Sequence, residues 1–412
     1  MINHCISLAI QPKKNIDMNI CITNYDLSPQ FIGGIKRVSS ILAKEWIKDN
    51  NVYFLCISPA GNQIKEICGI PQTHLPVPEE INSDKNLDFL IRFVNENKID
   101  IILHQHSDNL SFTELCINAK KQTRIKLVTT RHFAVSHNED ITKHAFFIKY
   151  KLQKSPIAWL KDFLFFIKYY LYKGRRNIKN DNRLYKHIIS NSDKFVLLSD
   201  SFVKELETRL DLTEAEKDKI CAINNPIELV KHKITPKKKR VLWCGRVEFG
   251  TKRVDRILEI WKRIAPKHPE WDLYIMGSGN IEYFKVITQK YNIPNVIFTG
   301  SCNPYDYYKD GSILCMTSSA ECWGMVLVEA QMFGCIPIAY DSYSSLGDII
   351  TDNVNGFKIA PFNKKQYAKR LEWLMENEDE RNKMFEECQQ SVKRFDVSII
   401  AQKWIDLFNE TL

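Results

Sequence analysis

Short apolar segments alternate with amphipathic helical patterns along the whole chain, and this alternation restricts the fold more than any other feature. Nearly continuous apolar character is typical of strands buried on both faces, as in parallel sheets covered by helices. The sequence therefore predicts an α/β fold. The predicted strands cover residues 19–23, 52–57, 99–103, 126–130, 195–198, 240–244, 272–276, 296–299, 313–316 and 336–339.

A chain of 412 residues exceeds what one hydrophobic core normally supports, so we expect two domains. The boundary is predicted after Asn224-Asn225-Pro226, where a polar, basic linker begins. The N-terminal domain then covers 1–226 and the C-terminal domain 227–394, followed by a terminal segment over 395–412. We expect two doubly wound, Rossmann-like domains that face each other across a cleft. Open α/β sheets bind ligands at the carboxyl ends of their strands, so chemistry is expected in those loops.

Composition narrows the class of protein. The net charge of +9 favours anionic partners such as phosphates, a membrane surface or nucleic acid, but no nucleic-acid-binding motif is present. The twelve cysteines lack the close pairs of zinc or redox sites. There is no basic leader and no run of about eighteen uncharged apolar residues. We therefore expect a reduced, cytoplasmic protein.

The most informative segment, residues 317–330, lies between two predicted strands. Gly324 ends a loop and Met325 begins a predicted helix, so free N–H groups and the positive helix end face an anion such as a diphosphate. Glu321 in the loop and Glu329 in the helix are eight residues apart. Carboxylates suit neutral hydroxyls, one set on a ribose and another on a sugar ring. A helix cap with an ordinary surface glutamate is the plainer interpretation.

A second cluster follows the predicted strand 240–244. Gly245 permits close approach of a ligand, and Arg246 and Lys252 on this loop can neutralise a diphosphate leaving group without a metal ion. Arg253 is an alternative to Lys252. Taken alone, these cations would be interpreted as solvated surface charges.

Weaker signals follow strands of the N-terminal half. Gly33-Gly34 opens a helical pattern and permits backbone contact with a ligand, although a plain turn has the same sequence. His132 ends a predicted strand, and both a role near the reaction centre and a structural role stay open. For His104 and His106 we favour a structural or acceptor-side role over a metal site, because no carboxylate or cysteine completes one.

Together these motifs resemble the retaining glycosyltransferases of family 4, which have the GT-B fold. Residues 321–329 resemble the family's E-x7-E motif, with Cys322-Trp323 where the family often has Gly-Phe. The resemblance implies that Glu329 binds the ribose hydroxyls and Glu321 the hydroxyls of the transferred sugar. Residues 245–252, with Arg246 and Lys252, are similar to the family's diphosphate clamp.

The resemblance covers essentially the whole C-terminal half and, more weakly, the N-terminal half. Gly33-Gly34 is similar to the family's N-terminal glycine loop, and His132 to its histidine near the donor hexose. Phe298 belongs to a strand end that resembles the one flanking the base. Residues 395–407 resemble the terminal helix that crosses back onto the N-terminal domain.

The resemblance implies transfer of a hexose, with retention, from a nucleotide-diphosphate sugar to a saccharide acceptor. A UDP-sugar is the expected donor, no metal or other cofactor is expected, and assembly of bacterial surface polysaccharide or lipopolysaccharide is the expected context. The alternatives are another GT-B activity, such as a nucleotide-sugar epimerase or a phosphorylase, and a sugar-nucleotide-binding protein that has lost catalysis.

Residues 143–179 contain ten Lys or Arg residues and one acid, interleaved with aromatic residues. Lys154, Lys161, Lys168 and Arg175 recur every seven residues along one side of a predicted helix. We interpret this segment as an acceptor-side insertion that rests on the anionic inner face of the cell membrane, with a lipid-linked acceptor. Packing of its aromatic face on the N-terminal domain is the alternative.

Overall fold

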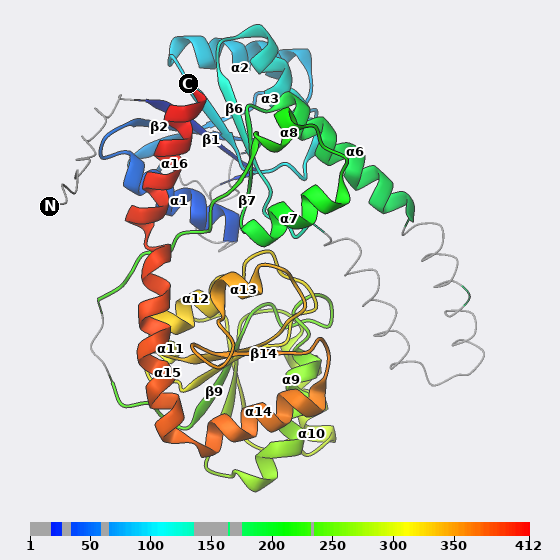
Figure 1. Ribbon diagram of the computed structural model, residues 1–412, viewed down its shortest axis with the longest axis vertical. Coiled ribbons are helices and arrows are strands. Elements are labelled where there is room, and N and C mark those ends of the chain that lie inside the picture. The colour runs from blue at the N-terminus through cyan, green and yellow to red at the C-terminus, as the bar shows by residue number, and fades with distance from the viewer. Residues whose placement is uncertain (1–17, 27–33, 59–65, 136–163, 165–174, 232–234) are drawn as a thin grey trace, which may run out of the picture.

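The computed structural model describes residues 18–26, 34–58, 66–135, 164, 175–231 and 235–412. These residues form two α/β units stacked along the long axis of the molecule (Figure 1). One unit contains an eight-stranded sheet and the other a six-stranded sheet, counted over the described residues. The predicted fold class, two doubly wound α/β domains, is confirmed.

The N-terminal sheet has the strand order β3-β4-β2-β1-β5-β6-β7-β8. Its pairs are parallel, apart from the antiparallel pair of β3 with β4. The strands are β1 (Asn19–Asn24), β2 (Asn51–Cys56), β3 (Glu66–Ile67), β4 (Ile70–His74), β5 (Ile101–His104), β6 (Lys126–Thr130), β7 (Lys194–Leu197) and β8 (Ile220–Ala222). The helices around it are α1 (Gly34–Trp46), α2 (Asp84–Glu96), α3 (Leu110–Gln122), α6 (Arg175–Asn191), α7 (Asp200–Arg209) and α8 (Glu214–Lys217).

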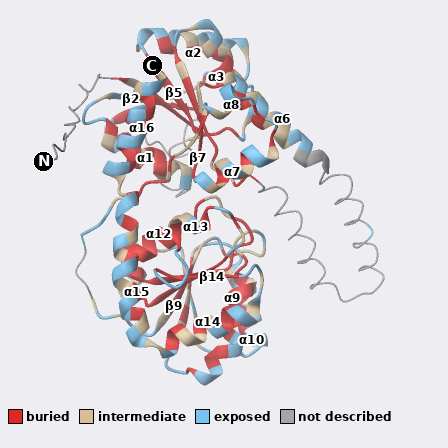
Figure 2. Cartoon of the chain, in the orientation of Figure 1, coloured by how far each residue is buried: buried red, intermediate tan, exposed pale blue. Residues whose placement is uncertain are grey.

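Alternation of side chains explains why both faces of this sheet are covered. Ile20 and Ile22 of β1 pack in a core formed with α1 and the C-terminal helix. Cys21, between them, points to the opposite face and packs in a core formed with α2 and α3. Figure 2 shows buried residues concentrated in the strands of both sheets.

The C-terminal sheet is entirely parallel, in the order β11-β10-β9-β12-β13-β14. Its strands are β9 (Arg240–Cys244), β10 (Asp272–Met276), β11 (Val296–Gly300), β12 (Ile313–Met316), β13 (Ile336–Tyr340) and β14 (Phe357–Ile359). The helical elements are α9 (Val254–Ile264), η2 (Ala265–Lys267), α10 (Ile281–Lys290), α11 (Tyr305–Tyr308), α12 (Met325–Met332), α13 (Leu346–Ile349), α14 (Lys364–Glu376), α15 (Glu378–Ser391) and η3 (Val392–Phe395). The chain winds outward in both directions from the central pair β9 and β12, which makes this pair the switch point of the sheet.

The last helix, α16 (Val397–Thr411), packs on the N-terminal unit. The Trp46 ring of α1 makes edge contacts with Trp404 and Phe408, at centroid distances of 6.5 and 5.5 Å, respectively. Trp46 Nε1 also donates a hydrogen bond to the Ala401 carbonyl oxygen at 3.2 Å. Helix α16 is therefore part of the core of the N-terminal domain.

The ten predicted strands are all present, with ends shifted by at most two residues. Four strands, β3, β4, β8 and β14, are additional to the predicted set and have two, five, three and three residues, respectively. The predicted insertion over 143–179 lies outside the described residues, except for the exposed Leu164 and the first residues of α6. Gly33 also lies outside them.

Candidate active site

The carboxyl edges of the two sheets face each other. Ser344, in the loop after β13, donates a hydrogen bond to a Glu205 carboxylate oxygen of α7 at 2.8 Å. Two of the predicted motifs follow β9 and β12, the neighbouring strands at the switch point. Ligands bind at this position in open α/β sheets, so the loops after β9 and β12 form the candidate site.

The loop after β9 approaches the loop after β10 so closely that only glycine fits. A Cβ atom added to Gly277 would lie 2.0 Å from the carbonyl oxygen of Gly245, and Gly277 has a φ of +132°. The Gly245 N–H donates to the Met276 carbonyl oxygen at 3.0 Å. These contacts fix the backbone on which Arg246 and Lys252 are carried.

Helix α12 begins at Met325, as predicted, and Gly324 is its N-cap. Gly324 has a φ of +84°, and a Cβ atom there would lie 2.9 Å from the Tyr343 hydroxyl oxygen, so the backbone and the neighbouring side chain both favour glycine. The Leu327 N–H donates to the Gly324 carbonyl oxygen at 2.9 Å, and no side chain caps the N–H groups before it, so these can face an anion. Met325 is the first residue of the helix.

Glu321 and Lys252 come together from the loops after β12 and β9. Lys252 Nζ lies 2.6 Å from Glu321 Oε1, and the same oxygen accepts a hydrogen bond from Ser318 Oγ at 2.7 Å. The stem of Lys252 runs beside Gly245, because a Cβ atom at that glycine would lie 3.5 Å from Lys252 Cδ. Two residues that the sequence assigned to separate motifs thus form one ion pair.

Lys252 and Arg253, the two alternatives for the diphosphate cation, have different surroundings. Arg253 is 5% exposed, adopts a φ of +54° at the start of α9, and makes two hydrogen bonds to the Asp255 carboxylate at 2.8 and 2.7 Å. Arg253 is therefore paired with a residue of the first turn of α9, whereas Lys252 is paired with Glu321. Arg246 is 75% exposed, with Glu248 as its nearest carboxylate at 3.9 Å.

Glu329 lies on α12 and is only 3% exposed. Its carboxylate accepts a hydrogen bond from Arg37 of α1, and the same guanidinium donates to the Tyr305 hydroxyl oxygen. Burial raises the pKa of Glu329, and the Arg37 charge opposes that rise. Sequence reasoning missed Arg37 and Tyr305; the position of Arg37 one turn into the helix that Gly34 begins was the only available signal.

His132 follows β6 at the carboxyl edge of the N-terminal sheet, and Gly34 begins α1 at the same edge. His132 Nε2 is 2.5 Å from Gln105 Oε1, which also accepts a hydrogen bond from Thr130 Oγ1 at 3.1 Å. With the Gln105 amide in this orientation, its Oε1 accepts and His132 donates from Nε2. Burial, aided by the nearby His106, lowers the pKa of His132 to about 3, so the ring is neutral at pH 7. Gln105 was not predicted.

The two histidines at the end of the neighbouring strand differ. His104 is fully buried, and its two ring nitrogens contact the hydroxyls of Thr23 at 2.9 Å and Thr113 at 3.0 Å, which is a structural arrangement. His106 Nε2 lies 3.3 Å from Asn24 Oδ1, and its ring packs against Tyr25 with centroids 4.4 Å apart.

Phe298 is partly buried in β11 and packs against the C-terminal core. Its strand ends at Gly300, whose carbonyl oxygen accepts a hydrogen bond from the Gly277 N–H at 2.9 Å. The backbone at this edge therefore adjoins the candidate site, and the proposed contact with a base stays a prediction.

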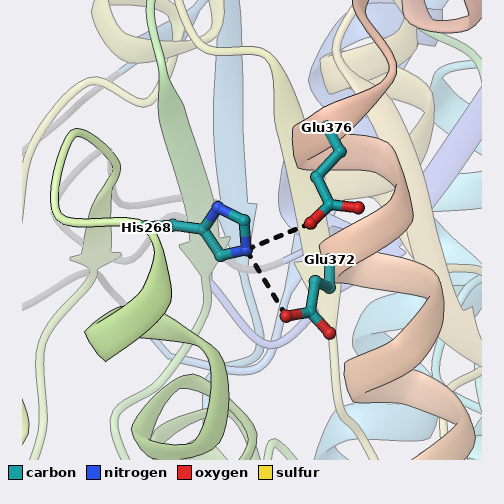
Figure 3. Close-up of side chains that lie close together, drawn as sticks. All are labelled: His268, Glu372 and Glu376. Atoms are coloured by element: carbon teal, nitrogen blue, oxygen red, sulfur yellow. Dashed lines mark hydrogen bonds and ion pairs between the residues drawn. The ribbon is translucent and has the colours of Figure 1, made fainter.

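Within the described residues, one group has metal-ligand spacing: His268, Glu372 and Glu376 (Figure 3). His268 Nε2 lies 3.4 Å from a Glu372 oxygen and 3.6 Å from a Glu376 oxygen. Lys267 Nζ already contacts the same Glu372 oxygen at 2.8 Å. His268 precedes β10 and so lies at the amino edge of the sheet, opposite the candidate site.

None of the helices in the described ranges is long and apolar enough to cross a membrane.

Both domains match known glycosyltransferase families. Residues 32–231 match the family described as "Glycosyltransferase Family 4", and residues 224–391 match "Glycosyl transferases group 1". The two matches together span 32–391, and the chain belongs to the family-4 type of GT-B glycosyltransferases.

Curated relatives agree with this class. An uncharacterised glycosyltransferase of Haemophilus influenzae is 28% identical over 207 residues, covering 47% of this chain and 58% of that protein. The amylovoran biosynthesis glycosyltransferase AmsD of Erwinia amylovora is 29% identical over 177 residues, covering 42% of this chain and 49% of the relative. The chain thus spans about half the length of the curated relatives it matches.

Solved structures support the fold over nearly the whole chain. The lipopolysaccharide outer core galactosyltransferase WaaB, in its apo form, has a TM-score of 0.68 at 17% identity and covers 96% of this chain and 100% of its own. Anabaena HepE in complex with UDP and glucose has a TM-score of 0.71 at 15% identity, with coverage of 95% and 100%, respectively. These likenesses establish the GT-B fold.

Proposed function

We propose that the protein transfers a hexose from a nucleotide-diphosphate sugar, in particular a UDP-sugar, to a saccharide acceptor with retention of anomeric configuration. The observation that carries the proposal is the arrangement around α12. An uncapped helix start is flanked by Glu321 and Glu329, and Lys252 lies beside Glu321. One anion site next to two carboxylates fits a ligand that combines a diphosphate with two sets of hydroxyls.

Each group then has a separate task. Glu329 accepts hydrogen bonds from the ribose hydroxyls, and Glu321 from hydroxyls of the transferred hexose. Arg246, Lys252 and the N–H groups of Gly324 and Met325 hold the diphosphate. Phe298 flanks the base, and the glycine loop at Gly34 adjoins the donor from the other domain.

Transfer requires no protein nucleophile in this scheme. The acceptor hydroxyl oxygen bonds to the anomeric carbon while the bond from that carbon to the diphosphate oxygen breaks. The electron pair stays with the diphosphate, and the acceptor proton moves to one of its oxygens. Arg246 and Lys252 stabilise the negative charge that develops there, so no metal ion is needed. His132, being neutral, orients the hexose through hydrogen bonding.

Named relatives support a role in building bacterial surface glycans. The Staphylococcus aureus relative is a poly(ribitol-phosphate) α-N-acetylglucosaminyltransferase, and the Campylobacter jejuni relative acts on an undecaprenol-linked saccharide. We propose a saccharide or lipid-linked saccharide acceptor for this chain as well. Contact of residues 143–179 with a membrane stays part of that proposal.

The deciding experiment measures donor turnover in Glu329→Gln and Glu321→Gln variants. Each substitution removes charge-assisted hydrogen bonds of about 1.5 to 3 kcal/mol, so transfer should fall roughly 10- to 150-fold while thermal unfolding still shows a folded protein. Glu380→Gln on α15, whose carboxylate pairs with Lys383 on the surface, is the matched control and should keep full activity. Turnover close to the parent level in both site variants would refute the donor-site assignment.

A further inference from the structure

The proposed ribose ligand Glu329 is already occupied in the structure. Arg37, from the first half of α1, holds the Glu329 carboxylate across the domain interface. The same guanidinium donates to the Tyr305 hydroxyl, and it lies 5.6 Å from the centre of the Tyr305 ring. Arg37 is thus fixed by two groups of the C-terminal domain.

This contact competes with a ribose for the same carboxylate. Glu329 is 3% exposed, so its carboxylate is covered, and Arg37 holds Oε1. A ribose that reaches Glu329 must therefore displace the guanidinium. The Arg37 side chain is 30% exposed, so it has solvent into which it can move.

We propose that Arg37 is an affinity-determining residue of the donor site: it occupies the ribose-binding carboxylate when no donor is bound, so donor binding and the Arg37–Glu329 ion pair exclude each other. This inference rests on the proposed function. The ion pair lowers the fraction of molecules that can bind a donor. The apparent affinity equals the intrinsic affinity multiplied by that fraction. It also keeps the buried Glu329 carboxylate paired until the ribose replaces Arg37.

The exchange depends on the rest of the donor. Two neutral ribose hydroxyls replace one charge-assisted bond on Glu329, which offers little net gain by itself. The diphosphate, held by Lys252 and the start of α12, has to supply the remaining free energy. A nucleoside without phosphate should therefore displace Arg37 poorly, which selects for the complete nucleotide.

The test is the dissociation constant of UDP, measured by calorimetry for the parent protein and for Arg37→Met. If about one parent molecule in ten has Glu329 free to bind UDP, removal of the competing guanidinium should lower the dissociation constant by roughly tenfold. Arg37→Gln, which keeps a hydrogen-bond donor beside the buried carboxylate, is a second variant should Arg37→Met unfold. It should tighten binding by a smaller factor.

Two controls isolate the effect. Lys44→Met removes another cation of α1 that also forms an interdomain ion pair, with Glu228 at 2.7 Å, and should leave UDP affinity unchanged. In an Arg37→Met, Glu329→Gln double variant, the gain seen with Arg37→Met should disappear, because the competed carboxylate is gone.

The outcomes separate the two proposals. Unchanged or weaker UDP binding in both Arg37 variants, with clear binding by the parent, overturns the role of Arg37 and leaves the proposed function standing. Failure of the parent and every variant to bind UDP or any other nucleoside diphosphate refutes the donor site itself, and the inference with it.

Discussion

A carboxylate beside a diphosphate site repels the ligand unless a cation neutralises it. Both acids of this site have such a partner: Lys252 contacts Glu321 at 2.6 Å, and Arg37 contacts Glu329. The site is thus paired internally, and a donor has to rearrange those pairs. Lys252 can turn from Glu321 to a phosphate oxygen as hexose hydroxyls take its place, which is the exchange proposed for Arg37 on the ribose side.

The same cations lead us to expect turnover without a metal ion. In the proposed function, Arg246 and Lys252 stand where a metal would otherwise neutralise the leaving diphosphate, so we expect transfer rates to persist in excess EDTA. Rates are compared before and after chelation, and again after addition of magnesium or manganese. Activity that disappears with EDTA and returns with metal would contradict this leaving-group chemistry.

Histidines that burial keeps neutral should make the N-terminal domain sensitive to acid. Burial lowers the pKa of His104, like that of His132, to about 3, from an ordinary value of 6.5. The unfolded chain therefore takes up protons first as pH falls below about 6.5, and stability should decline by about 1.4 kcal/mol per pH unit for each such histidine. Thermal unfolding at pH 7.5 and pH 5.5 measures the decline.

His104→Gln provides the comparison. Glutamine retains hydrogen-bonding groups near Thr23 and Thr113 but does not titrate, so the variant should be less stable than the parent at pH 7.5 and lose less on going to pH 5.5. An equal acid-induced drop in both proteins would show that His104 does not contribute.

At the scale of elements, the site is built from loop ends whose shapes depend on glycine. The turn after β10 crosses the turn after β9 at van der Waals distance, with Gly277 against the Gly245 carbonyl. Helix α12 follows a left-handed residue, Gly324, and no side chain caps its first turn. These local requirements explain why the predicted glycines and the strand ends coincide.

Gly277→Ala should destabilise the protein and weaken donor binding together. The added Cβ would meet the Gly245 carbonyl oxygen at 2.0 Å, which forces the loop carrying Arg246 to move. Gly300→Ala is the matched control at the same sheet edge, because Gly300 also has a positive φ, of +72°, but no atom lies within 4 Å of its added Cβ. We expect only about 1 to 2 kcal/mol of backbone cost there. If Gly277→Ala changes the melting temperature and the UDP affinity as little as Gly300→Ala does, this packing is contradicted.

At the scale of the molecule, the chain ties its two domains together with its last helix. The C-terminal domain ends in η3, Ile227 pairs with Asp396 in an isolated bridge, and α16 then packs on α1. Helix α1 also carries Arg37, which contacts Glu329 in the other domain. One helix thus contacts both the terminal helix and the candidate donor site, so the packing of α16 supports the position of Arg37.

Trp404→Ala tests that support. Its ring packs against Trp46 and Phe408, and loss of a buried aromatic side chain costs about 3 to 5 kcal/mol. The urea midpoint followed by circular dichroism should fall clearly. Ile399→Ala, on the same helix but 44% exposed, should change stability by less than about 0.5 kcal/mol. Indistinguishable midpoints for the two variants would contradict the role of α16.

Local patterns in the sequence determined much of this protein. The apolar periods predicted ten strands, and Gly324 predicted the start of α12, because periodicity and turn geometry depend on neighbouring residues. The strand ends placed Gly245 and Glu321 in loops at the same edge of the sheet. The short strands β3, β8 and β14, of two or three residues, are too brief for a period to show and are set by pairing with neighbouring strands. Tertiary structure alone decided which cation meets which acid. Arg253 has a left-handed backbone and pairs with Asp255. Arg37 pairs with Glu329, 292 residues further along the chain, and no local sequence pattern carries information over that separation.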